Sequence, residues 1–162
     1  MGLNEAFLGL GSNLGDPVSN IREALGLLGR LARSMEVSRL YRTTPQGFSD
    51  QPDFVNAACR LWTDLDPFEL LDAALRIERA IGRHRTFANA PRSLDIDVLM
   101  YGRQVLQGPP LTIPHPRMHN RAFVLRPLLD IAPGLVHPFA GKTVQLMWDE
   151  IEMDGELISQ VS

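Results

Sequence analysis

Apolar and polar positions recur along this chain with two different periods, which predict strands and helices. Helical spacing predicts one helix from about Pro17 to Leu31 and a second over residues 68–82, each following an Asp-Pro pair that can supply an N-cap and a first helical residue. The apolar face of the first helix consists of Ile21, Ala24, Leu25, Leu28 and Leu31. Strand character marks residues 5–12, 35–41, 54–63 and 93–102. The predicted order is therefore strand, helix, strand, strand, helix, strand.

This order is typical of the ferredoxin-like α+β class, in which an antiparallel β-α-β-β-α-β sheet carries helices on one face. Downstream, the proline-rich segment 108–120 excludes a regular helix, whereas residues 121–132 and 143–151 predict the short helices of a C-terminal extension. No repeat or linker divides the sequence. We therefore expect a single domain over residues 1–162, with a frayed tail after about Asp154.

Composition and charge argue against several classes of partner. The chain has 162 residues, a net charge of -3 and a pI near 5.8, so no global attraction draws it to nucleic acid or to anionic membranes. No apolar run approaches the roughly 18 residues of a membrane-spanning helix, and the start MGLNEAF lacks the features of a signal peptide. We expect a cytoplasmic protein. Its one cysteine, Cys59, lies in an apolar run that favours a buried thiol over a nucleophile.

Two acidic residues on the last predicted strand form the strongest candidate site. Asp95 and Asp97 are two positions apart, so the strand period directs both carboxylates to one face and the intervening apolar residues to the other, toward the helices. Mg²⁺ prefers such oxygen ligands, and it takes one or two carboxylates together with phosphates and water. The alternative for an Asp-x-Asp pair alone is a solvated strand face.

Basic residues flank this pair on both sides in the sequence. Arg83, Arg85 and Arg92 precede it in an irregular loop, and His115, Arg117, His119 and Arg121 follow it in a proline-bounded loop. Arginine suits phosphate because its planar fork can bind bidentately. Each of these residues taken singly is more often a surface charge, so the hypothesis is their convergence on a phosphate and metal site.

The glycine-rich segment GLGSNLGD at residues 9–16 gives a weaker signal. It contains Gly-x-Gly, but the third glycine of a dinucleotide-binding fingerprint falls one position early, and no lysine follows as a P-loop requires. A phosphate-binding loop is one reading. A glycine turn that lets the strand and the first helix pack closely is at least an equal alternative.

Five ordered motifs together resemble the 6-hydroxymethyl-7,8-dihydropterin pyrophosphokinase family, over about residues 6 to 140. They are GLGSNLGD, YRTTPQG, DQPDFVNAA, LDIDVLMYG and IPHPRMHNRAFVLRPL. The resemblance implies a ferredoxin-like fold, a monomer and a transferase of folate biosynthesis. It implies that Mg²⁺ and ATP bind before the pterin, and that diphosphate passes from ATP to the pterin hydroxymethyl group with release of AMP.

The resemblance also assigns roles to individual residues. Asp95 and Asp97 match the ligands of two magnesium ions and, with Arg83 and Arg92, the catalytic residues. The ATP contacts implied are Glu78, Arg83, Arg92, His115 and Arg121. The pterin contacts implied are Thr43, Thr44, Gln46, Phe54, Asn56 and Phe123. In this assignment Asn56 meets the hydrogen-bonding edge of the pterin, and the two phenylalanines hold the ring between their faces. Without the motifs, ordinary core packing is the favoured reading for both phenylalanines.

The sequence departs from the family pattern at a few positions. Asn89 and Ala90 stand where the family usually has tryptophan and glycine, so the usual tryptophan stack over the pterin is in doubt and Phe87 is the candidate replacement. Gln46 replaces a common leucine, and Pro116 replaces an aromatic residue. These changes affect side-chain contacts and remove no charged ligand.

Two other functions fit the same fold class. One is a small-molecule-binding or regulatory module whose altered loop no longer closes over a substrate. The other is an RNA-binding module, which would need exposed aromatic residues on central strands and a basic face. The acidic net charge and the two strand aspartates oppose RNA binding, and retention of Asp95, Asp97, Arg83 and Arg92 favours an enzyme over a binder.

Overall fold

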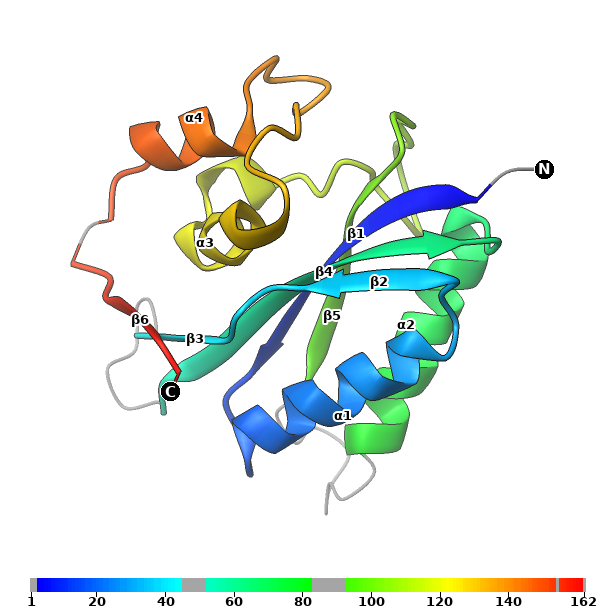
Figure 1. Ribbon diagram of the computed structural model, residues 1–162, viewed down its shortest axis with the longest axis horizontal. Helices are drawn as coiled ribbons and strands as arrows, with labels where there is room; N and C mark the ends of the chain where they lie inside the picture. Colours follow the sequence, from blue (N-terminus) through cyan, green and yellow to red (C-terminus); the bar gives the residue numbers. More distant parts are fainter. Residues whose placement is uncertain (1–2, 45–51, 83–92, 154, 162) are drawn as a thin grey trace.

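The structure, a computed structural model that describes residues 3–44, 52–82, 93–153 and 155–161, contains a six-stranded antiparallel sheet (Figure 1). The strands are β1 (Asn4–Ser12), β2 (Ser34–Val37), β3 (Tyr41–Thr43), β4 (Phe54–Thr63), β5 (Asp95–Tyr101) and β6 (Ile158–Gln160). They lie in the order β5-β1-β4-β3-β6, and β2 also pairs with β4. The helices are α1 (Pro17–Gly29), α2 (Pro67–Ile81), α3 (Ala122–Ile131) and α4 (Val144–Glu150).

The predicted β-α-β-β-α-β order is confirmed, with one strand divided in two. The strand expected over residues 35–41 is β2 followed by β3, and between them the chain gains one residue relative to β4. The cause is Ser38, whose hydroxyl takes the place of a backbone acceptor: it accepts the Ala58 N–H at 2.9 Å and donates to the Arg39 carbonyl at 2.7 Å. A serine side chain that competes with the ladder in this way produces a bulge.

Helices α1 and α2 pack on one face of the sheet, as Figure 1 shows. Each begins at an aspartate N-cap followed by proline, and the Asp66 cap is strengthened by a reciprocal hydrogen bond with Glu69. The predicted inner face of α1 is confirmed for four of its residues, Ile21, Ala24, Leu25 and Leu28. Leu31 was expected to join them and is 39% exposed, because the helix ends at Gly29.

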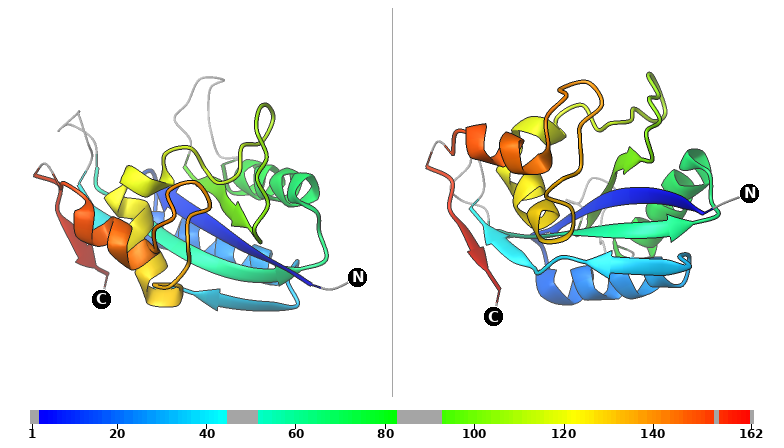
Figure 2. Two further views of the ribbon diagram at one scale, coloured as in Figure 1. Left: turned by 90° about the horizontal axis from the view of Figure 1, so that it is seen from above. Right: turned by 45° about the horizontal axis from the view of Figure 1, so that its top comes forward.

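The two C-terminal helices lie across the sheet from α1 and form a second, smaller core. Both were expected as helices, and α3 packs directly on β4 with α4 behind it (Figure 2). This core joins residues of the sheet to residues of the helices, namely Phe7, Ala58, Leu99 and Met100 with Val124, Leu125, Leu128, Val144 and Met147. Cys59 faces the other core and is fully buried, as predicted, and burial raises the pKa of its thiol to about 12.

The tail is ordered differently from the expectation. Residues after Asp154 were predicted to fray, but β6 pairs with β3 in the register Tyr41 with Gln160 and Thr43 with Ile158. The prediction was wrong because β3 offers a free edge of backbone donors and acceptors, which the sequence of the tail alone does not reveal.

None of the described helices combines the length and the apolar composition needed to cross a lipid bilayer.

A charged cluster holds α3 against β3. The carboxylate of Asp130 accepts hydrogen bonds from the Tyr41 hydroxyl at 2.8 Å and from the Arg39 backbone and guanidinium at 3.0 Å each. Arg126 lies 3.6 Å from the same carboxylate and covers the Tyr41 ring. Burial alone would raise the pKa of Asp130, but the hydrogen bonds from Arg39 and Tyr41 outweigh it and hold this pKa below its ordinary value.

We expect Asp130→Asn to lower the free energy of unfolding at neutral pH by about 1–3 kcal/mol, because it weakens the hydrogen bonds to a carboxylate whose side chain is only 7% exposed. A carboxyl whose folded-state pKa is depressed stabilises the fold above its unfolded pKa, about 3.9, and this contribution disappears as the pH falls through the lower folded-state pKa. The gap between wild type and variant should therefore narrow below about pH 4. Urea unfolding across pH measures it, with the surface change Asp149→Asn as control. A gap of equal size at all pH values would contradict the assignment.

Candidate active site

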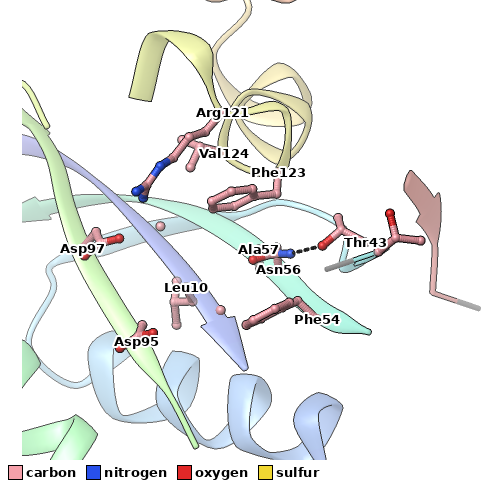
Figure 3. Close-up of a pocket in the computed structure, with 13 residues that line it drawn as sticks. Leu10, Thr43, Phe54, Asn56, Ala57, Asp95, Asp97, Arg121, Phe123 and Val124 are labelled. Atoms are coloured by element: carbon pink, nitrogen blue, oxygen red, sulfur yellow. Dashed lines mark hydrogen bonds between the residues drawn. The ribbon is translucent and has the colours of Figure 1, made fainter. Parts of the chain in front are cut away.

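A cavity of about 270 Å³ lies on the sheet face opposite α1, where α3 and α4 leave the strands uncovered (Figure 3). Its lining comes from β1, β4 and β5, from the end of β3 and from the start of α3. Elements far apart in the sequence therefore meet in it. Of the predicted site residues that the structure describes, Thr43, Thr44, Phe54, Asn56, Asp95, Asp97, Arg121 and Phe123 line this cavity.

Glycines of β1 form the floor of the cavity. Gly9 pairs with Asp97 and Gly11 with Asp95 across the β1–β5 ladder, so these glycines share the face of the two aspartates. A Cβ atom on Gly11 would lie 2.9 Å from the Asn56 Oδ1, closer than real contacts allow. The glycines of GLGSNLGD therefore have different roles. Gly9 and Gly11 lie inside the strand, whereas Gly15, with φ of 67°, forms the turn that leads toward α1.

Asp95 and Asp97 both face the cavity from β5, as the two-residue period predicts. The intervening Ile96, with Leu94 and Val98, is buried in the core beneath α1 and α2. The Asp97 side chain is about half exposed, and its Oδ2 lies 4.0 Å from the Nε2 of His115. The aspartates are thus anchored by the hydrophobic core and remain accessible from the cavity.

Glu78 of α2 holds β5 from its outer side. Since β5 is an edge strand, its ladder with β1 satisfies only one side of its backbone. Glu78 is 7% exposed, and its carboxylate accepts the backbone N–H of Ile96 at 2.6 Å. This N–H lies between the two aspartates in sequence. The structure therefore shows Glu78 fixing the backbone that carries Asp95 and Asp97, and an ATP contact for it stays a prediction.

Asn56 and two phenylalanines form the apolar end of the cavity. Asn56 is 4% exposed, and its Nδ2 donates to the Thr43 Oγ1 at 2.8 Å, which fixes the orientation of the amide. Figure 3 shows the rings of Phe54 and Phe123 separated by a gap, with Asn56 behind it. Both rings are only partly buried. This favours pocket walls over ordinary core packing.

Basic groups approach the cavity from the α3 side. Arg121 directs its guanidinium toward the Asp97 side of the cavity (Figure 3), and the group lies 5.4 Å from the centre of the Phe123 ring. Burial, together with the charges of Arg121 and Arg117, lowers the pKa of His115 despite the opposing effect of Asp97. His115 is therefore mainly uncharged at neutral pH.

The predicted basic cluster converges only in part. His115 and Arg121 reach the Asp97 side of the cavity, whereas His119 packs against His137 with ring centres 6.0 Å apart, beside α4. The predictions for Arg83, Arg92 and Gln46, and for Phe87 as a replacement for tryptophan, fall outside the described residues.

Some cavity residues were not singled out from the sequence. Gly9 and Gly11 were placed in the predicted strand 5–12 and weighed as a phosphate loop or a turn, and not as part of the site, although the Leu-Gly alternation of residues 8–11 carries the strand period that puts both glycines on the aspartate face. Val124, on the first turn of α3, and Ala57, on β4, also line the cavity. Nothing in their local sequence marks them.

Comparison with known proteins supports the family that the sequence motifs resemble. A family model described as 7,8-dihydro-6-hydroxymethylpterin-pyrophosphokinase (HPPK) matches residues 7–133. The 2-amino-4-hydroxy-6-hydroxymethyldihydropteridine pyrophosphokinase of Pseudomonas aeruginosa is 46% identical over 138 residues, 84% of this chain and 85% of the relative. The corresponding protein of Haemophilus influenzae is 44% identical over 135 residues, 82% of this chain and 84% of the relative.

Longer relatives and solved structures agree. The folic acid synthesis protein fol1 of Schizosaccharomyces pombe is 40% identical over 93% of this chain, which spans only 21% of that protein. The crystal structure of wild-type Plasmodium falciparum HPPK-DHPS with STZ-DHP has a TM-score of 0.74 at 17% identity, covering 91% of this chain and 43% of that one. At this identity the likeness shows the ferredoxin-like fold alone. The family match and the bacterial relatives show that the chain belongs to the 7,8-dihydro-6-hydroxymethylpterin-pyrophosphokinase family.

Proposed function

We propose that this protein transfers diphosphate from ATP to the hydroxymethyl group of 6-hydroxymethyl-7,8-dihydropterin, releasing AMP, as a step of folate biosynthesis. The observation that carries the proposal is one cavity with two chemically different ends. A slot between two aromatic rings, backed by an oriented amide, continues into a pair of carboxylates flanked by arginine and histidine. Family membership and the names of the bacterial relatives support the same reaction.

The apolar end suits a pterin. A flat heteroaromatic ring gains stacking energy between the faces of Phe54 and Phe123. Asn56 uses one of its two amide N–H groups to donate to Thr43, so its Oδ1 and its second N–H remain to meet the hydrogen-bonding edge of the ring. Thr43, Thr44 and Gln46 complete the proposed pterin contacts.

The acidic end suits magnesium bound to the triphosphate. Among the described residues no cluster of three or more histidine, cysteine or acidic side chains could hold a metal alone. Two neighbouring carboxylates nevertheless fit Mg²⁺, which completes its coordination with phosphate oxygens and water. We infer that Asp95 and Asp97 hold the proposed two ions, which would offset the negative charge of the phosphates during transfer.

The role of the protein is then to position the two substrates and to neutralise the charge of the phosphates. Transfer to a hydroxyl needs alignment of the attacking oxygen with the leaving AMP more than a protein nucleophile. Arg121 and His115 reach the phosphate end of the cavity, and Arg83 and Arg92 are proposed to add to them from their loop. Glu78 keeps the two aspartates in register through Ile96.

We include a monomeric state and a cytoplasmic location in the proposal. Its partners are the small molecules ATP and the hydroxymethyl pterin.

The reaction is tested by incubating the protein with Mg²⁺, ATP and the hydroxymethyl dihydropterin. We expect AMP and pterin diphosphate in equal amounts, and neither without the pterin. Production of ADP, or of AMP without a pterin product, would refute the proposed transfer.

Asp97→Asn should lower kcat by at least about 100-fold, because it removes a charged ligand that orients the reacting phosphates. Steady-state kinetics at saturating substrates measures this, with thermal unfolding to show an intact fold. The matched control is Asp72→Asn, the same chemical change on the exposed face of α2. Equal activity of the two variants would contradict the proposal that Asp97 is a metal ligand.

Gly11→Ala should raise the dissociation constant of the pterin about tenfold, because the new Cβ displaces the Asn56 amide 2.9 Å away. The affinity for a non-hydrolysable ATP analogue should change less than twofold. Fluorescence titration and calorimetry measure the two affinities. Gly26→Ala is the control, since a Cβ on that α1 glycine meets nothing within 4 Å. Normal pterin affinity in Gly11→Ala would contradict the proposal that the pterin binds beside Gly11 and Asn56.

A further inference from the structure

The last strand of the chain contacts the proposed pterin pocket from behind. β3 has only three residues, and it lies between β4 on one side and β6 on the other. On the β4 side, Thr43 pairs with Phe54 and Tyr41 with Asn56. On the β6 side, Thr43 pairs with Ile158. The strand that carries the threonines of the pocket is therefore held in place from both edges.

The contact is most specific at Thr44, which lines the cavity immediately after β3. The Thr44 backbone N–H donates to the Leu157 carbonyl at 3.1 Å, and the Thr44 hydroxyl accepts the Leu157 N–H at 3.0 Å. One residue of the tail thus fixes both the backbone and the side chain of Thr44. A hydroxyl that accepts from the tail must direct its own hydrogen elsewhere, because it carries one proton and two acceptor positions.

Leu157 makes this contact through its main chain. Leu157 is 70% exposed, so apolar burial contributes little to its placement. The tail has further polar anchors, from the Val161 N–H to the Leu40 carbonyl at 2.9 Å and from Arg39 to the Gln160 side chain at 3.4 Å. Residues 157–161 therefore form a strap that is hydrogen-bonded along β3, and Leu157 is the residue of this strap that contacts the cavity lining at Thr44.

The strap also reaches Asn56 through one intermediate. β6 pairs with the main chain of Thr43, and the Thr43 hydroxyl accepts the amide hydrogen bond that orients Asn56. The proposed nucleotide side of the cavity lies farther from the strap, because β5, which carries Asp95 and Asp97, is at the opposite edge of the sheet from β6. A change in the strap should therefore weaken binding of the pterin and leave binding of ATP largely unchanged.

We propose that the C-terminal strand is a positioning element for the pterin, in which the main chain of Leu157 sets the hydroxyl and backbone of Thr44 and steadies the Thr43–Asn56 pair. This inference rests on the proposed function, since it names which substrate the strap serves. Leu157 touches no substrate itself and acts through Thr44.

The test compares Leu157→Pro with Leu157→Ala in the full chain. Both variants remove the exposed side chain, and only proline also removes the N–H that Thr44 accepts. We expect Leu157→Ala to behave as wild type. Leu157→Pro should raise KM for the pterin at least about fivefold relative to Leu157→Ala, while KM for ATP stays within about twofold. A purely structural role would lower thermal stability and activity without this split between the two substrates.

Equal pterin KM values for the two Leu157 variants, or equal shifts in both substrates, would overturn the proposal. If Leu157→Pro does not fold, Val161→Pro and Val161→Ala decide, because only proline removes the N–H that anchors the tail to the Leu40 carbonyl away from the cavity. A raised pterin KM in the proline variant alone supports the strap, and equal pterin KM values in the two variants refute it. Absence of pterin diphosphate with the wild-type protein would instead refute the proposed function, so the two failures are distinguishable.

Discussion

The alternation of side chains across the central strands is the constraint on which the other features depend. In β1, Leu8 and Leu10 enter the core beneath α1 and α2, so Gly9 and Gly11 must face the other way. The same rule directs Ile96 into that core and both neighbouring aspartates out of it. A shift of one residue in the β1–β5 register would bury the aspartates and expose the core, so the hydrophobic effect itself fixes the carboxylates in place.

The second core decides where on the open face a ligand can lie. α3 and α4 cover the end of the sheet near Phe7 and Met100 and leave the end near Gly11 and Asp95 open. The boundary between the two ends is the first turn of α3, which contributes Phe123 and Arg121 to the cavity. Asp130 ties the far end of this helix to β3, so the same cluster holds the helix that carries Phe123 against the strand that pairs with Phe54.

How far the sequence predicted this arrangement depends on the range of the interactions involved. The helices and the main strands follow from local periodicity and from the Asp-Pro caps, and the facing of Asp95 and Asp97 follows from the strand period. The break at Ser38, the pairing of the tail with β3 and the hydrogen bond from Ile96 to Glu78 each depend on a partner 18 or more residues away. Local patterns carry no information about such partners. The roles of individual site residues came from the family motifs and stay predictions, and Arg83, Arg92 and Gln46 also lie outside the described residues.

The two ends of the cavity should differ in the physics of binding as well as in composition. The proposed pterin end offers stacking and hydrogen bonds from neutral groups, and these interactions depend little on ionic strength. At the other end, Asp95 and Asp97 present negative charge where the proposed function brings a polyphosphate. A bare nucleotide is repelled there, whereas a nucleotide carrying divalent cations is attracted. In the proposed function, the two carboxylates would therefore select the metal-bound form of ATP, because the charge of Arg121 at this end does not cancel the charges of both aspartates.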